Sequence, residues 1–202
     1  MKLAASSKIF IIMALFVFVS NGYTATVDTA EPALNNNWAL LLYGGTHAQN
    51  SISDIITFDA DYAGDNHMVV TAVNWQAFSY QPYVSFEIEG QLGRHFGDDV
   101  SHWEFVTLVL GRWHAFPWDD IVRTSFAFGS GFSSYTEISR LEQTPEDDAQ
   151  RLLGYLAFEL TFGLPQLPRW DLLVRIHHRS GMKGIIGEGS SNFLAAGLKY
   201  SF

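Results

Sequence analysis

The sequence predicts an all-β fold: an eight-stranded antiparallel transmembrane β-barrel of the outer-membrane type, preceded by an N-terminal signal peptide. Three observations predict it. An N-terminal apolar run has the length of a signal-peptide core, eight later segments alternate between apolar and polar residues, and the connections between those segments are alternately long and short. With 202 residues, 48% of them hydrophobic and 16% charged, the chain is the size of one domain with a full core.

Composition excludes several classes of function. The chain has no cysteine, so disulfide scaffolds, thiolate metal sites and cysteine nucleophiles are ruled out. It has 21 acidic against 12 basic residues and no basic tract, which argues against binding to nucleic acid. Seven histidines remain available for chemistry.

The N-terminus has the pattern of an export signal. Lys2 and Lys8 flank a polar start, and residues 9–19 (IFIIMALFVFV) form an unbroken apolar run of 11 residues. An uncleaved membrane anchor is the alternative, but a spanning helix needs about 20 apolar residues. A signal peptide is therefore the better interpretation.

A small-residue cleavage site could follow Gly22 or Ala25. We expect a signal peptide over residues 1–25 and a single barrel domain over residues 26–202, with no internal repeat and no second domain. Removing Lys2 and Lys8 with the signal leaves 10 basic against 21 acidic residues, a net charge of −11.

Eight segments after the signal have a period of two, which is the period of a β-strand. They are predicted at 38–47, 67–78, 83–94, 102–113, 121–132, 151–163, 169–180 and 192–202. The third is clear: Val84, Phe86, Ile88, Gly90 and Leu92 form one face, and Ser85, Glu87, Glu89, Gln91 and Gly93 form the other. The fifth, sixth and eighth alternate in the same way, whereas the pattern defines the register of the first, second and fourth less well.

A soluble sandwich would also alternate, but two further features favour a membrane barrel. The segments are about 10 to 13 residues long, against about 5 to 6 for a typical globular strand. Aromatic residues lie near strand ends, as interfacial girdles require: Trp38, Trp75, Tyr80, Tyr83, Trp103, Trp113, Trp118, Trp170 and Tyr200.

The polar faces hold an ionisable set that can pair inside a narrow lumen: Glu87, Glu89, Arg123, Glu159, Asp171, Arg175 and His177. Eight strands leave room for packed side chains and not for a pore.

The connections alternate in length as those of an outer-membrane barrel do. With both termini periplasmic, the connections that point outward are 48–66, 95–101, 133–150 and 181–191, and the inward turns are 79–82, 114–120 and 164–168. The two longest outward connections are acidic, and we expect them to be solvated surface loops.

The candidate chemistry lies in the strand predicted at 169–180. Its even positions are apolar up to Ile176 and then continue into His178 and Ser180, so both polar residues are expected to face the membrane near its outer interface. An imidazole and a hydroxyl on one face can form a base and nucleophile pair. The alternative for an isolated His-x-Ser is a polar rim just above the apolar band. His177, on the luminal row beside Arg175, is expected to belong to the buried polar network.

The last third of the chain resembles the lipid A 3-O-deacylase family, the PagL-like outer-membrane enzymes. The resemblance rests on His178-Arg179-Ser180 at the end of the penultimate strand, a glycine-containing loop, and a last strand that ends in Phe202. It covers about 35 residues; elsewhere only the architecture matches. It implies an eight-stranded barrel with a site that faces the membrane, His178 as general base, and Ser180 as the nucleophile that attacks an ester-linked acyl chain.

The chain departs from this family at two positions. The family completes a Ser-His-Glu triad with an acidic residue early in the last strand, where this chain has Asn192; Glu188, four residues earlier, is the alternative third member. An asparagine can orient a histidine, although it stabilises imidazolium less than a carboxylate does. The family has an asparagine directly after the serine, implicated in the oxyanion hole, where this chain has Gly181. Backbone N–H groups of Gly181 or of the 184–189 loop could substitute for it.

No cofactor or metal is predicted. The glycines at 181, 184, 187 and 189 lie between two strands with no helix after them, which indicates a hairpin and not a phosphate loop. His177 and His178 point to opposite faces, no HExxH motif occurs, and the other histidines are scattered along the sequence.

The sequence therefore predicts an esterase of the cell outer membrane that removes an ester-linked acyl chain, at the 3-O position by resemblance, from the lipid A of lipopolysaccharide. Its partners would be lipid A and the outer membrane, without nucleic acid; association as a homodimer is left open. Two alternatives stand: a non-catalytic barrel whose acidic loops bind an external partner or shield the surface, and a soluble periplasmic lipocalin-like binder. The last would need a wide apolar interior.

Overall fold

We analysed a computed structural model of the chain. It describes residues 37–49, 51–62, 65–80, 82–142, 150–181 and 185–202. The predicted signal peptide with both cleavage positions, the start of the predicted barrel domain, and Gly184 lie outside the described residues.

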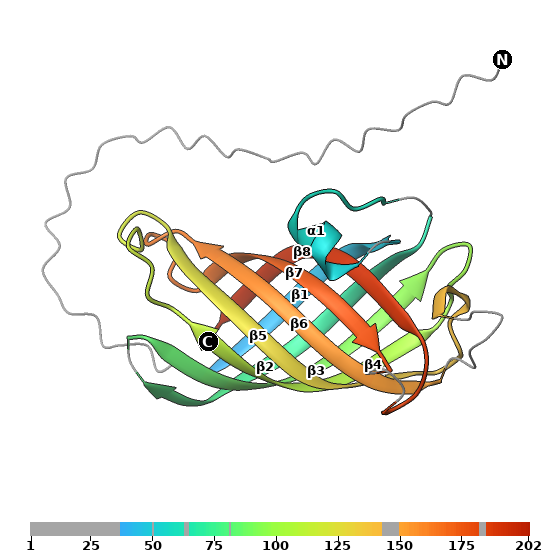
Figure 1. The fold of residues 1–202 in the computed structure, drawn as a ribbon. Helices are drawn as coiled ribbons and strands as arrows, with labels where there is room; N and C mark the ends of the chain where they lie inside the picture. The colour runs from blue at the N-terminus through green and yellow to red at the C-terminus, as the bar shows by residue number, and fades with distance from the viewer. Residues whose placement is uncertain (1–36, 50, 63–64, 81, 143–149, 182–184) are drawn as a thin grey trace, which may run out of the picture. The chain divides into compact units, whose positions relative to one another are not determined.

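The described chain forms a closed antiparallel barrel (Figure 1). Its strands are β1 (Trp38–Ala48), β2 (His67–Tyr80), β3 (Val84–Phe96), β4 (Trp103–Trp113), β5 (Arg123–Tyr135), β6 (Leu152–Gly163), β7 (Trp170–Ser180) and β8 (Ser190–Ser201). Each strand pairs with the next one in sequence, and β8 pairs with β1 to close the sheet. The predicted fold class is confirmed, and the predicted strand limits agree within three residues.

The barrel has an apolar exterior and a largely polar interior, as the alternating pattern predicts. On β3, Phe86 and Ile88 are exposed on the outside, whereas Glu87 and Glu89 are buried inside. A soluble barrel would place its apolar residues inward, so this arrangement suits a surface that contacts lipid.

Three strands alternate poorly in sequence because their inward rows are apolar as well. Leu41 and Tyr43 of β1 and Val70 of β2 belong to one buried cluster in the lumen. Leu108 and Leu110 of β4 belong to a second cluster. The lumen is therefore part apolar and part ionic, and the sequence pattern was clear only where the inward row was polar.

The ionic part of the lumen is a connected network around two arginines. Arg175 Nη1 lies 2.6 Å from Glu89 Oε1, and the same guanidinium also pairs with Glu159. Arg112 Nε lies 2.7 Å from Glu87 Oε1, and its Nη2 lies 2.8 Å from Glu159 Oε1. The structure thus confirms that ionisable residues pair inside the barrel.

We call the end of the barrel with the short connections the turn end and the opposite end the loop end. Most of the predicted girdle lies around the turn end, where neighbouring rings pack against one another, as in Trp38 with Trp75 and Trp170 with Tyr200. Trp103 at the loop end packs under the guanidinium of Arg94 instead. The girdle is therefore unequal at the two ends.

Two outward connections are more structured than plain solvated loops, which corrects the expectation for them. A short helix, α1 (Ile52–Ile56), buries Ile55 against the outside of the barrel. A 3-10 turn, η1 (Arg140–Glu142), buries Glu142 at the loop end, where its carboxylate pairs with Arg179 at 2.7 Å. Both connections are fixed by contacts with the barrel: α1 by an apolar contact and η1 by an ion pair. A local sequence pattern does not reveal such contacts. No helix in the described part of the chain is long and apolar enough to cross a membrane.

Candidate functional site

The predicted site residues lie on the outer face of β7 and β8 near the loop end. His178 is the register partner of Asn192, and Ser180 is the register partner of Ser190. Their even positions continue the apolar outward row of β7, whereas Arg179 and His177 are buried inside. His178 and Ser180 therefore lie on the outer side of the wall, the side that the alternation predicts.

His178 and Asn192 are joined by a hydrogen bond of 2.7 Å between Nδ1 and Oδ1. Because an amide oxygen only accepts, Nδ1 carries the hydrogen and Nε2 keeps its lone pair. Asn192 is 8% exposed, so the bond is shielded from water. In this tautomer Nε2 can accept a proton, as a general base must.

Ser180 lies two residues beyond His178 on the same face, about 7 Å away along the strand. Within the described residues, no hydrogen bond links the Ser180 hydroxyl to the imidazole. The residue opposite Ser180 on β6 is Gly154, so β6 places no side chain directly beside the serine. Free enzymes often show such loose geometry, which tightens once substrate is bound.

Of the two alternatives for the third residue, Asn192 is the one that contacts the imidazole. Glu188 is exposed and lies in the connection before β8. The Gly181 N–H, one of the donors predicted for the oxyanion, is donated to the Gly189 carbonyl at 3.0 Å in this structure. A Cβ at position 181 would stand 1.8 Å from the Gly187 oxygen, so this close approach of two backbones explains the glycine.

The segment that carries α1 covers the apolar surface beside the His178–Asn192 pair. Ile176 and Leu194 are register partners, and each lies two residues nearer the middle of the barrel than His178 or Asn192 on the same strand. Ile176 packs in one cluster with Ile55 of α1, and Leu194 lies against it. Figure 1 shows α1 beside β7 and β8 at this place. Sequence analysis missed the contact, although the isoleucines at 52, 55 and 56 were a signal for a helix with one apolar face.

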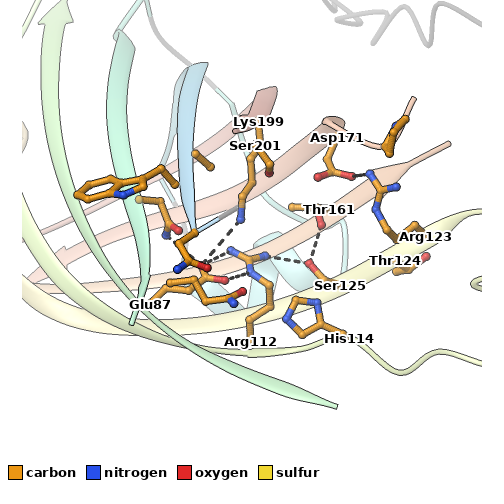
Figure 2. A pocket seen from close by; sticks show the side chains of 16 residues that line it. Glu87, Arg112, His114, Arg123, Thr124, Ser125, Thr161, Asp171, Lys199 and Ser201 are labelled. Atoms are coloured by element: carbon orange, nitrogen blue, oxygen red, sulfur yellow. Dashed lines mark hydrogen bonds and ion pairs between the residues drawn. The ribbon is translucent and has the colours of Figure 1, made fainter. Parts of the chain in front are cut away.

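A second polar site, a cavity of about 230 Å³, lies inside the turn end of the barrel (Figure 2). Glu87, Arg112, His114, Asp171 and Lys199 are among its lining residues. Figure 2 shows the Arg112 guanidinium between Glu87 and Ser125, with the His114 ring close by. The cavity is an extension of the ionic network, and at its edge the Ser85 hydroxyl lies 2.8 Å from His114 Nε2.

His114 makes the stability of this end depend on pH. Burial, together with the Arg112 guanidinium and Lys199, lowers the pKa of His114 to about 4, against the opposing charges of Glu87 and Asp119. The unfolded chain binds this proton near pH 6.5 and the folded chain only near pH 4, so the free energy of unfolding should fall as pH drops between these values.

We therefore expect the folded barrel to lose on the order of 1 kcal/mol between pH 7 and pH 5 through His114. His114→Gln keeps a hydrogen-bonding group near Ser85, its present partner at 2.8 Å, but cannot take up the proton. Urea unfolding of the detergent-solubilised barrel at the two pH values measures the difference, with His67→Gln at the other end as control. Equal pH slopes in the wild type and His114→Gln would contradict the assignment.

No protein-family model matches the chain, and no curated protein matches it in sequence. Among solved structures, the outer membrane enzyme PagL matches with a TM-score of 0.57 and 8% identity, over 81% of this chain and 99% of PagL. Neisserial surface protein A (NspA) matches with a TM-score of 0.50 and 9% identity, over 82% of this chain and 96% of NspA. At these identities the likeness establishes the fold, an eight-stranded barrel, and nothing finer.

Proposed function

We propose that this protein is an esterase of the outer membrane that hydrolyses an ester-linked acyl chain of lipid A, with Ser180 as nucleophile, His178 as base and Asn192 as the residue that orients the base. The observation that carries the proposal is the 2.7 Å bond from His178 Nδ1 to Asn192 on the outer, apolar wall. Polar side chains on a lipid-facing wall cost free energy unless they are hydrogen-bonded, so their presence there points to a functional role.

The location of the site supports a lipid substrate. Leu172 and Val174 on the outward row of β7 are exposed, whereas Ile55 of α1 covers Ile176, so an acyl chain can lie along the exposed part of this row with its ester nearer the loop end. If the loop end faces the cell exterior, this ester lies at the level of the outer leaflet, which contains lipid A. The barrel fold shared with PagL and NspA supports the membrane location.

The reaction follows from the two nitrogens of His178. Nδ1–H is donated to Asn192, so Nε2 takes the proton of Ser180 as its oxygen attacks the ester carbonyl. The tetrahedral intermediate collapses when His178 returns this proton to the departing sugar oxygen, which leaves an acyl-serine. Water, deprotonated by Nε2, then releases the fatty acid and restores Ser180.

The direct test is mass spectrometry of lipid A from cells with and without the protein. We expect the loss of one hydroxyacyl mass only in cells that carry it. Unchanged lipid A, with the folded barrel present in the outer membrane, would overturn the proposal for this substrate.

Asn192 allows a sharper test of the same site. Asn192→Asp keeps the shape of the side chain and supplies the charge that stabilises imidazolium, so we expect the rate of ester hydrolysis to rise, on the order of 100-fold or more. Asn192→Leu should lower the rate, because His178 loses its orienting partner. Initial rates on purified lipid A in detergent measure both, and a slower Asp variant would contradict the assigned role.

A non-catalytic barrel is the second candidate, and two observations favour it. The Gly181 N–H is already used by the Gly189 carbonyl, and Ser180 and His178 are not hydrogen-bonded in the described structure. Such a barrel would act through its acidic connections at the loop end. It predicts that lipid A stays unchanged and that Asn192→Asp has no effect on it.

A further inference from the structure

Inside the loop end of the barrel, three side chains from three strands meet at one point. Glu104 Oε2 lies 2.8 Å from His95 Nε2 and 2.9 Å from His177 Nε2. The strands β3, β4 and β7 supply one residue each, and all three are at most 1% exposed. These atoms form a set of two imidazole nitrogens and one carboxylate oxygen within 4.8 Å of one another.

The charge of Glu104 is balanced differently from that of the other buried glutamates. Within the described residues, Glu87, Glu89, Glu142 and Glu159 each pair with an arginine. Glu104 pairs only with the two histidines, which are charged only if protonated. A buried carboxylate needs a positive charge beside it, because desolvation penalises the bare anion heavily. A proton on an imidazole or a divalent cation can supply that charge.

The hydrogen bonding around the cluster is also incomplete. His95 Nδ1 is buried without a hydrogen-bond partner in the described structure, and so is Nε2 of His102. The His102 ring is stacked on His95 with 4.7 Å between centroids. Buried polar atoms of a purely structural network are almost always satisfied, so two orphaned imidazole nitrogens make this cluster unusual, although neither is among the three atoms that meet at Glu104.

We propose that His95, Glu104 and His177 bind a divalent transition-metal ion of the zinc class. Nitrogen and carboxylate donors in this number suit Zn²⁺ and exclude Mg²⁺ or Ca²⁺, which prefer all-oxygen sites. Ligand atoms around tetrahedral zinc stand roughly 3.3 Å apart, so each Nε2 needs to separate from Oε2 by about half an ångström, and the two Nε2 atoms, now within 4.8 Å of each other, need to take up the same spacing. The ion replaces the hydrogens between these atoms and leaves a position for water or a further ligand.

Residues around two of the three ligands, His177 and Glu104, hold them as metal ligands are usually held, whereas His95 Nδ1 has no partner within the described residues. His177 Nδ1 lies 3.0 Å from the Tyr155 hydroxyl, which fixes the ring with Nε2 toward Glu104. Ser133 donates its hydroxyl to the other oxygen of Glu104 at 2.5 Å. The ion would join three strands of the barrel wall at the loop end and neutralise Glu104. Its role is therefore structural, and it is separate from the lipid-facing pair, which lies on the other side of the wall.

The test is to refold the mature chain, without an affinity tag, from urea into detergent with either Zn²⁺ or EDTA, because the enclosed site must be loaded during folding. We expect about one zinc per folded barrel after desalting, measured by elemental mass spectrometry. We also expect a higher temperature for the heat-induced change in gel mobility. Folded wild-type barrel without bound zinc would overturn the proposal. A protonated imidazole would then be the group that neutralises the negative charge of Glu104.

Variants locate the ion. The double variant His95→Gln/His177→Gln should weaken zinc binding by more than about 100-fold. Loss of a residue that only hydrogen-bonds a ligand costs roughly 10- to 100-fold, and this variant removes two ligands. His67→Gln, on the outer face of β2, is the matched control and should bind zinc as the wild type does. Zinc retained in full by the double variant would also overturn the proposal. If the double variant fails to fold, Glu104→Gln serves in its place, and zinc in the folded wild type remains decisive.

Discussion

Replacing Ser180 with alanine is expected to slow the removal of an acyl chain from lipid A by at least about 1,000-fold, because the variant lacks the hydroxyl that forms the covalent acyl-enzyme. His178→Ala should cost a similar factor, since the serine is then no longer deprotonated. The double variant should be hardly worse than either single variant, because residues that act as one unit are not additive.

Mass spectrometry of lipid A from cells that express each variant measures this effect. Ser190→Ala is the matched control: Ser190 is the register partner of Ser180 on β8, on the same face, and has no assigned role. It should leave the loss of the hydroxyacyl mass unchanged. Full activity of Ser180→Ala, with the folded barrel present at wild-type level, would remove Ser180 from the mechanism.

Replacing Arg175 with methionine is expected to destabilise the barrel by about 3 to 5 kcal/mol, the usual cost of breaking a buried ion pair from one side. Arg175 is fully buried and pairs with both Glu89 and Glu159. Methionine fills much of the same volume but leaves these carboxylates without a cation, apart from the contact between Glu159 and Arg112.

Urea unfolding in detergent measures the loss, and Arg123→Met is the matched control. The Arg123 pair with Asp171 is at the rim, where the arginine side chain is 38% exposed, so its loss should cost less than about 1 kcal/mol. Equal effects of the two variants would show that burial does not set the strength of these pairs. Adding Glu89→Gln to Arg175→Met should recover part of the loss, because Glu89 pairs only with Arg175 within the described residues and its uncompensated charge is then removed.

The two variants act on opposite sides of the barrel wall. Ser180 lies outside, so its change should leave stability unaffected. Arg175 lies inside, so its change should affect activity only through the amount of folded protein. Measuring both quantities on both variants therefore separates chemistry from folding.

The period-two pattern predicted the eight strands, because the side-chain direction along a strand is a local property, and with the N-terminal apolar run, the strand lengths, the aromatic girdle and the alternating connections it predicted the closed barrel. For the same reason it placed His178 and Ser180 on the outer wall and Arg175 and His177 in the lumen. It also put Asn192 on the same face as His178. The pattern was weak for β1, β2 and β4, where apolar residues face both ways.

Contacts between strands were decided by the tertiary structure, since they depend on the registers that closure sets. Alternation cannot say that Asn192 lies opposite His178, and only the pairing of β7 with β8 brings the Asn192 amide to the imidazole. The sequence separates His95, Glu104 and His177 so widely that no metal-binding motif is visible. Only closure of the sheet brings β3 and β4 to face β7 across a narrow lumen, and only then do three scattered side chains become neighbours.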